Sequence, residues 1–280
     1  ATGEWVRRAL TALDAVTGGQ GGLAAAGTGD DAVRASLVQA LGDRPSAVGD
    51  SLLHFATAAA SVREYLSTST WRLLGPLEAA RHALPVDAAK AEMFVVVEEL
   101  DKVMTELAAF AGFTMESTVR GPGWRFLDIG RRIERALLLI GLLEATLLDR
   151  PDPLVVQPLY ELVLVAGESL VAYRRRYRSD LELDALCELL LADDANPRSL
   201  AFQLDRLGDD LATLPERRER RDQQALLRVA AEALIGFTAS SEQELRKVLL
   251  ATRGPLLELD ASVVAAWFAH THTGRAVGGS

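Results

Sequence analysis

The chain of 280 residues contains one cysteine, and aromatic residues make up only 6% of it. A single cysteine excludes an intramolecular disulfide, so packing has to hold the fold together, and the sequence favours a cytoplasmic protein. Cys187 lies in the apolar helical pattern LDALCELLL, which is typical of a small buried side chain.

Long apolar runs are also missing. The best candidate, ALLLIGLLEATLL, is interrupted by Glu144 and is shorter than the roughly 20 residues that a membrane helix needs, so it indicates a core helix. We expect no signal peptide, because the sequence lacks a basic segment followed by an apolar run and a cleavage site. The first residues, ATGEW, include no initiator methionine, which suggests a piece of a longer protein.

The charge balance excludes one broad class of function. A formal net charge of -9 and a pI near 5.1 argue against a general nucleic-acid binder, which needs a wide basic face. Apolar residues at 49% and charged residues at 25% are ordinary for a soluble globular protein.

Strand signals are nearly absent, whereas apolar residues recur at the i, i+3, i+4, i+7 spacing of amphipathic helices throughout the chain. We therefore predict an all-α fold, a single antiparallel bundle of about ten helices that forms one domain over 1–280. A flexible glycine-rich loop is expected at 18–29 and a frayed tail at 271–280. Helices are predicted near 4–16, 30–42, 46–67, 69–84, 86–114, 123–149, 156–178 and 179–193. A further helix is predicted to start after Asn196, its N-cap, and the last third over 220–270 is predicted to be helical with a break at Gly254-Pro255. We expect 123–149 and 156–178 to be the central antiparallel pair.

One helix combines a charged start with an apolar continuation. The stretch GPGWRFLDIGRRIERALLLIGLLEATLL begins at residue 121, and six charged side chains fill its first half. The face that carries the arginines continues one turn later as Leu138, Leu139 and Leu142, so the charges do not follow a solvated stripe. Glu134 lies between the charged face and the apolar one. The six charged residues are Arg125, Asp128, Arg131, Arg132, Glu134 and Arg135.

Guanidinium groups at such a position need carboxylates or an anion, because an unpaired buried charge is costly. Asp128 can reach arginines within its own helix. For the remaining arginines we expect partners on the next helix, where Glu161 and Glu168 are seven residues apart on one face, followed by Arg175. Three interpretations remain open: an interhelical salt-bridge network, a pocket for phosphate or carboxylate with bidentate arginine contacts, and a surface interaction patch.

The YRRRY stretch belongs to the same candidate site. Tyr173 and Tyr177 are four residues apart and face together, while three consecutive arginines spread around the helix and favour a solvated helix end. The full ligand-binding set that we predict is Arg125, Asp128, Arg131, Arg132, Glu134, Arg135, Glu161, Glu168, Tyr173, Arg175 and Tyr177.

Motifs for other chemistry are weak, so we expect no metal and no cofactor. His270 and His272 do not share a helix face, and His54 and His82 are isolated. The Glu-x-x-His pairs of di-iron bundles, phosphate loops and nucleophile elbows do not occur. The NPRS start of a helix is explained by capping, or by an anion site that Arg198 assists.

Three motifs in order, GWRFLDIGRRIERA, ESLVAYRRRY and NPRSLAFQLDRL, resemble the alpha-E domain, an all-helical family named for a Glu-Arg motif. The motif falls on Glu134 and Arg135, REYLSTSTWRLL is also similar, and the resemblance covers roughly residues 50 to 270. Two departures are evident. The family's first Glu-Arg helix is missing, which truncation, fusion or divergence would explain, and FATAAAS at 55–61 replaces an AREN-like segment.

The resemblance implies an association with circularly permuted ATP-grasp ligases, with transglutaminase-like proteases as frequent neighbours. Two functions follow as hypotheses. In the first, which we favour, the chain is a non-catalytic binding and scaffolding module that offers its arginine cluster to an anionic substrate or to the ligase. In the second, it is a catalytic component of amide-bond formation, with Glu134 or Glu168 as a general base in an apolar surrounding.

Overall fold

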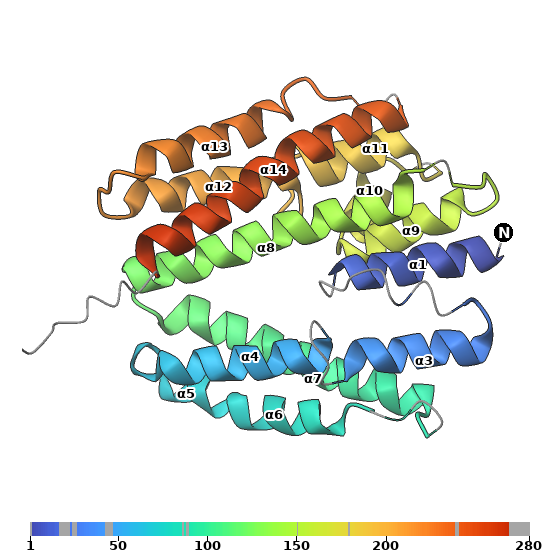
Figure 1. The fold of residues 1–280 in the computed structure, drawn as a ribbon, viewed down its shortest axis with the longest axis horizontal. Coiled ribbons are helices and arrows are strands. Elements are labelled where there is room, and N and C mark those ends of the chain that lie inside the picture. The colour runs from blue at the N-terminus through green and yellow to red at the C-terminus, as the bar shows by residue number, and fades with distance from the viewer. Residues whose placement is uncertain are drawn as a thin grey trace, which may run out of the picture.

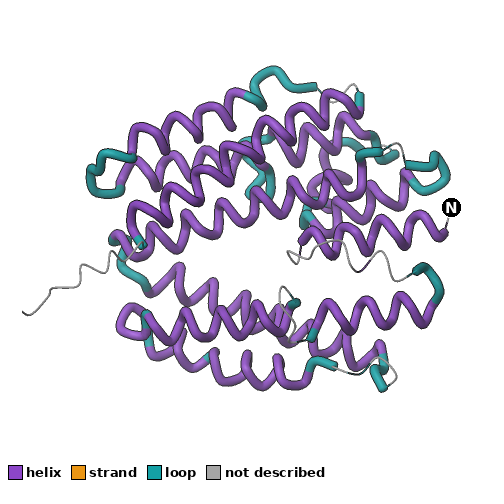
Figure 2. Tube along the Cα trace, viewed as in Figure 1, coloured by secondary structure: helices purple, strands orange, loops and turns teal. Residues whose placement is uncertain are grey.

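The computed structural model describes residues 2–16, 23, 27–42, 47–85, 87, 90–149, 151–178, 180–238 and 241–268. Over these residues the regular elements are helices and no strand is present, which confirms the all-α class (Figure 2). The predicted loop at 18–29 lies largely outside the described residues. The tail at 271–280, together with His270 and His272, lies outside them entirely.

The helices form two layers (Figure 1). One layer holds α3 (Asp30–Leu41), α4 (Val48–Ser61), α5 (Thr68–Arg72), α6 (Leu74–Ala83) and α7 (Met93–Ser117), with the short 3-10 turn η1 (Arg63–Tyr65) before α5. The other holds α1 (Thr2–Val16), α8 (Pro122–Leu147), α9 (Val156–Ala166), α10 (Leu170–Arg176), α11 (Leu183–Cys187), the π-turn η2 (Glu188–Ala192), α12 (Leu200–Thr213), α13 (Arg220–Glu232) and α14 (Glu242–Trp267).

Helix α8 lies at the centre of its layer. It begins at Pro122, a position where the missing backbone N–H of proline costs no hydrogen bond. Its most extensive contacts are with α1 and α12, followed by α14, and those with α9 are fewer. The predicted central pair of 123–149 with 156–178 is therefore wrong.

The physical reason is that 156–178 is not one helix. Helix α9 ends at Ala166, and Glu168 adopts a left-handed backbone with φ of 51°. The freed carbonyls at the end of α9 are satisfied locally, since the N–H of Gly167 donates to Val163 O and that of Ser169 to Leu164 O. Helix α9 is thus too short to cover the charged start of α8.

Two further predicted boundaries differ from the structure. Helix α14 continues through Pro255 without the predicted break, because the carbonyl that proline leaves without a donor belongs to the exposed Ala251. Helix α12 is capped by Ser199 rather than Asn196, since the Ser199 hydroxyl accepts from Phe202 N at 3.1 Å. Asn196 instead forms a turn that precedes the cap, accepting from Arg198 N at 3.1 Å.

Most buried residues belong to one layer or the other, and a small cluster of Leu10, Leu23 and Ala40 joins α1 to α3. One large cluster joins α8, α9, α11, α12, α13 and α14, with Ile140, Leu143, Leu159 and Leu249 fully inaccessible. The α3–α7 layer has smaller clusters, one of which gathers Leu52, Leu77 and Val103 with their neighbours. Cys187 is in the large cluster, and burial raises the pKa of its thiol to about 12, so the predicted structural role is confirmed.

Helix α1 is fastened to the end of α8 through a buried arginine. The Arg8 guanidinium donates to the carbonyl oxygens of Thr146 (3.1 Å), Leu148 (2.6 Å) and Asp149 (3.0 Å), and its Nε donates to Glu4 at 3.0 Å. The last carbonyls of a helix have no partner within the helix, so Arg8 supplies the missing donors. This contact fixes α1 alongside α8, where residues of both helices line a cavity.

Candidate functional site

The charged start of α8 faces α12. Arg125 forms an ion pair with Asp210 at 2.6 Å, and Arg132 forms one with Asp128 at 3.0 Å while also donating to the Gln203 amide oxygen at 3.3 Å. The prediction that a carboxylate on a neighbouring helix pairs with one of these arginines is confirmed by the Arg125–Asp210 pair. The helix is α12, however, and not the segment that carries Glu161 and Glu168.

Glu161 and Glu168 lie at the surface. Glu161 pairs with Arg174 at 3.2 Å, where both side chains are more than half exposed. Glu168 is exposed in the bend after α9, and Arg175 is exposed on α10. In the described part of the chain neither of these two enters an ion pair. The predicted contact of Glu161 and Glu168 with the α8 arginines is therefore wrong, because Glu161 lies on an exposed face of α9 and Glu168 lies in the bend that follows this helix.

Tyr173 and Tyr177 do face together, with ring centroids 4.8 Å apart. Tyr173 is fully buried, its hydroxyl donates to Asp180 O at 3.1 Å and it accepts from Glu182 N at 2.9 Å. Burial raises the pKa of Tyr177 to about 12. These contacts fix the loop between α10 and α11, so the two tyrosines are structural and do not line the arginine site.

Asp128 and Asp210 form a buried carboxyl pair between α8 and α12, only 4% and 2% exposed. Their outer oxygens bind Arg132 and Arg125, whereas Asp128 Oδ1 and Asp210 Oδ2 are sealed from solvent without a hydrogen-bond partner. Burial raises the pKa of Asp210 above its ordinary value, Arg125 opposes the shift, and Asp128 adds to it. A proton held on Asp210 and donated to Asp128 satisfies both oxygens.

This arrangement predicts a pH dependence of stability. The folded protein holds the Asp210 proton more tightly than the unfolded chain, so Asp210 contributes stability below its unfolded pKa that is lost as pH rises through its raised folded pKa. Asp210→Asn can still donate to Asp128 and has no proton to lose. We expect its stability relative to wild type to rise with pH above about pH 4 in urea unfolding.

The matched control is Asp209→Asn, which changes an exposed carboxylate on the same helix that pairs with Arg206. Its stability should run parallel to the wild-type curve. A parallel curve for Asp210→Asn as well would show that Asp210 is ionised at every pH tested, contrary to the shared proton.

Arg135 is the residue of the cluster that the surrounding carboxylates do not neutralise. It is half-buried, and among the described side chains no carboxylate forms an ion pair with it. Burial lowers the pKa of its guanidinium, and the charges of Arg131, Arg198 and Arg132 lower it further, with Asp128 alone opposing them. Positive charge therefore exceeds negative charge at this point between α8 and the start of α12.

Three residues of this network lie outside the ligand-binding set that the sequence predicted. Asp210 and Gln203 were absent from the predicted set, although both fall on the apolar face of α12, where polar residues at i and i+7 among leucines indicate a polar contact within the core. Arg198 was foreseen only as an aid to an anion at the NPRS turn, and it lies close enough to affect Arg135.

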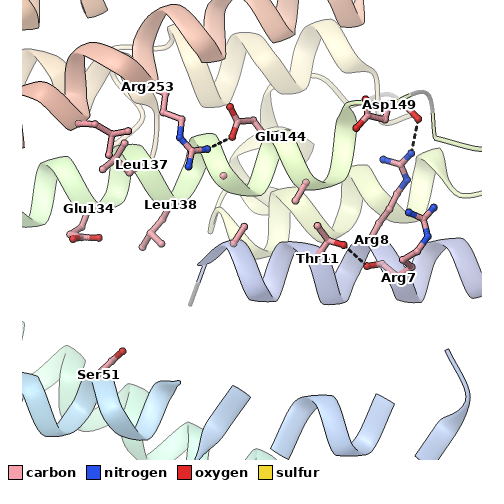
Figure 3. A pocket seen from close by; sticks show the side chains of 14 residues that line it. Arg7, Arg8, Thr11, Ser51, Glu134, Leu137, Leu138, Glu144, Asp149 and Arg253 are labelled. Carbon is pink, nitrogen blue, oxygen red and sulfur yellow. Dashed lines mark hydrogen bonds and ion pairs between the residues drawn. The ribbon is translucent and has the colours of Figure 1, made fainter. Parts of the chain in front are cut away.

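Glu134 does not join the arginines. Its exposed side chain extends from α8 towards α4 and lines a cavity with residues of α1 and α14 (Figure 3). The adjacent Glu134 and Arg135 therefore serve two different sides of α8, because successive residues on a helix point about 100° apart.

In the part of the chain that the structure describes, no three or more His, Cys, Asp or Glu side chains gather in a way that could hold a metal ion. None of the helices in that part has the length and apolar character needed to cross a membrane.

Comparison with known proteins places this geometry in a family. Residues 3–268 match the model of the Alpha-E family, described as a predicted alpha-helical domain with a conserved ER motif, and the match begins well before residue 50. The uncharacterised proteins Mb2597 of Mycobacterium bovis and Rv2567 of Mycobacterium tuberculosis are 41% identical over 175 residues, or 62% of this chain. The aligned segment is 20% of each relative, so the chain spans about one fifth of their length. No solved structure matches. The chain, with Glu134 and Arg135 on its central helix, belongs to the Alpha-E family.

Proposed function

We propose that this domain is a helical binding module that holds an anionic group, a carboxylate or a phosphate, between α8 and the start of α12. The observation that carries the proposal is Arg135, a half-buried guanidinium whose charged surroundings are mainly three other arginines. An anion placed among them would neutralise the excess charge and accept bidentate hydrogen bonds.

The remaining contacts support a site that is formed before the ligand arrives. Arg132 is held by Asp128 and Gln203, which fixes its guanidinium against α12. Arg131 is 27% exposed in its side chain, lies 3.8 Å from Asp128 Oδ1 and donates to Met115 Sδ at 3.3 Å, whereas Arg198 is exposed. Arginines that are already held in place reduce the ordering cost of binding.

The proposed setting is amide or peptide-bond formation by a circularly permuted ATP-grasp ligase, with the anion as a substrate group or a group of the ligase itself. Family resemblance supports this setting, and transglutaminase-like proteases are proposed as neighbours on the same ground. The mycobacterial relatives carry the similar segment within much longer chains, which leaves room in them for further domains.

The catalytic alternative has less support. It requires Glu134 or Glu168 to lie in an apolar surrounding, and both side chains are exposed. The desolvation that would make either carboxylate a general base is therefore missing.

The test is calorimetric titration with inorganic phosphate and with succinate at low ionic strength. Wild type should bind one of them, and Arg135→Gln should weaken binding about tenfold, the equivalent of roughly 1.4 kcal/mol. The ligand-free variant should melt at the same temperature as wild type or slightly above it, because like charges at i, i+4 destabilise a helix by about 0.2–0.5 kcal/mol per pair.

Arg221→Gln is the matched control, since Arg221 is an exposed arginine on α13 far from the cluster in sequence. It should bind as wild type does. The proposal is overturned if neither anion binds wild type and Arg135→Gln melts several degrees lower, because the cluster would then be a structural ion-pair network.

A further inference from the structure

A cavity of about 790 Å³ lies on the other side of α8 from the arginine cluster. Helices α1 and α8 form one wall and α14 contributes to it, while Ser51 of α4 faces it from the second layer (Figure 3). Its lining has charged residues towards both ends, and between them apolar side chains lie beside the Glu144–Arg253 ion pair. The lining residues used below are Arg7, Ser51, Glu134, Leu138, Gly141 and Ala145.

Most charged groups of this lining already have partners. Arg8 is bound to the last carbonyls of α8, Glu144 forms an ion pair with Arg253, and Asp149 pairs with Arg246 at 2.8 Å. Glu134 and Arg7 differ, because among the described residues no ion pair or hydrogen bond engages the carboxylate of Glu134 or the guanidinium of Arg7; the Thr11 hydroxyl donates only to the backbone carbonyl of Arg7. The cavity therefore presents one available carboxylate and one available guanidinium.

These two charges lie at opposite ends of the cavity. Helix α1 runs antiparallel to α8, since Ala15 lies beside Gly141 and Arg8 reaches Thr146 to Asp149. Arg7 is consequently level with the C-terminal end of α8, whereas Glu134 lies two turns before Gly141. At 1.5 Å per residue the two positions are on the order of 20 Å apart along the helix axis.

The floor between the two ends is mainly apolar. Leu138, Gly141 and Ala145 line it beside the Glu144–Arg253 ion pair, and Gly141 lets Ala15 of α1 pack close to α8. The Ser51 hydroxyl on the opposite wall is exposed and can donate or accept a hydrogen bond. Such a floor fits a chain with small side chains and a polar backbone.

We propose that this cavity binds a short extended peptide with free ends, its amino group against Glu134 and its carboxylate against Arg7. An extended chain covers about 3.3–3.6 Å per residue, so roughly six residues span the distance between the two charges. The arrangement of the charges sets the direction of the peptide, because the reverse direction would bring like charges together. This site shares no residue with the arginine cluster and stands independently of the proposed function.

The experiment is calorimetric titration with the hexapeptide Ala-Gly-Ala-Gly-Ala-Gly, compared with its N-acetylated and C-amidated forms. Wild type should bind the free peptide, and each blocked end should weaken binding about fivefold, the effect of losing one accessible ion pair of roughly 1 kcal/mol. The tripeptide Ala-Gly-Ala cannot reach both charges and should bind more weakly than the hexapeptide.

Two variants assign the ends. Glu134→Gln should bind the free and the acetylated peptides equally, and Arg7→Gln should bind the free and the amidated peptides equally. Both side chains are exposed, so both variants are expected to fold, which circular dichroism checks. Glu116→Gln on α7 and Arg221→Gln on α13 are the charge-matched controls and should keep the wild-type pattern.

The peptide site is overturned if no hexapeptide binds at millimolar concentration, if blocking either end leaves affinity unchanged, or if the variants fail to remove the matching sensitivity. Arg135→Gln should bind the hexapeptide as wild type does, and Glu134→Gln should keep phosphate or succinate binding. The two proposals therefore fail in different measurements.

Discussion

Arg125→Met should lower the free energy of unfolding by about 3 kcal/mol at neutral pH. The Asp210 carboxylate is 3% exposed and loses the Arg125 guanidinium at 2.6 Å, while its neighbour Asp128 is another buried carboxyl group. Without Arg125 the folded variant avoids a buried, unpaired carboxylate only while Asp210 is protonated. Burial already raises the pKa of that group, so the proton is held more tightly than in the unfolded chain. The loss should therefore be smaller at acidic pH and grow as pH rises, as urea unfolding at several pH values would show.

A second substitution separates the lost charge from lost packing. Asp210→Asn in the Arg125→Met background removes the isolated carboxylate, so it should restore more than half of the lost stability. Arg206→Met is the matched control, because Arg206 forms an exposed pair with Asp209 on the same helix as Asp210. Its cost should be within about 0.5 kcal/mol. A cost of that size for Arg125→Met would contradict the buried pair.

Arg8→Met should cost about 2–4 kcal/mol, because it leaves buried carbonyl groups at the end of α8 without donors at roughly 1–3 kcal/mol for each unsatisfied group. Three carbonyl oxygens depend on this one guanidinium, and the α1 contact that brings it there is also weakened. Thermal unfolding followed by circular dichroism should show a drop of several degrees. Limited proteolysis should cut first near residue 149, where the end of α8 would fray.

The neighbouring Arg7 provides the comparison. Arg7 is exposed, and Arg7→Met should change stability by less than about 0.5 kcal/mol. Arg8→Lys should recover only part of the loss, since an ammonium group cannot place donors at three separate oxygens in the way a planar guanidinium does. Equal stability of Arg8→Met and Arg7→Met would mean that the carbonyls at the end of α8 are satisfied by water.

The sequence predicted most of the helices and the kind of ion pair formed by the charged start of α8, but not which helices meet. Apolar periodicity located α1, α3, α7 and α8 within a few residues, except that α7 begins later than expected. The charged start of α8 also implied carboxylates on a neighbouring helix, and Asp210 supplies one. The error lay in choosing the helix next in sequence, because local patterns do not specify contacts between residues as far apart as 125 and 210.

The break between α9 and α10 was beyond the sequence signals used. Glu168 adopts a left-handed backbone that glycine usually occupies, so its residue type gives no sign of the break. At Pro255 the error was the opposite one: a break was predicted because proline usually ends a helix, but α14 continues through Pro255. Both cases depend on whether nearby carbonyls find other donors, which is decided by tertiary structure and not by residue type.

The unequal division of the core has a consequence for how the domain moves. The α8 layer shares one large buried cluster, whereas the α3–α7 layer is held by smaller ones, so the latter should open as a separate cooperative unit at a lower free energy. The cavity lies between Ser51 in the weaker layer and Glu134 in the stronger one. Any occupant that touches both walls would bind the closed state alone, and would thus couple the fluctuations of the two layers.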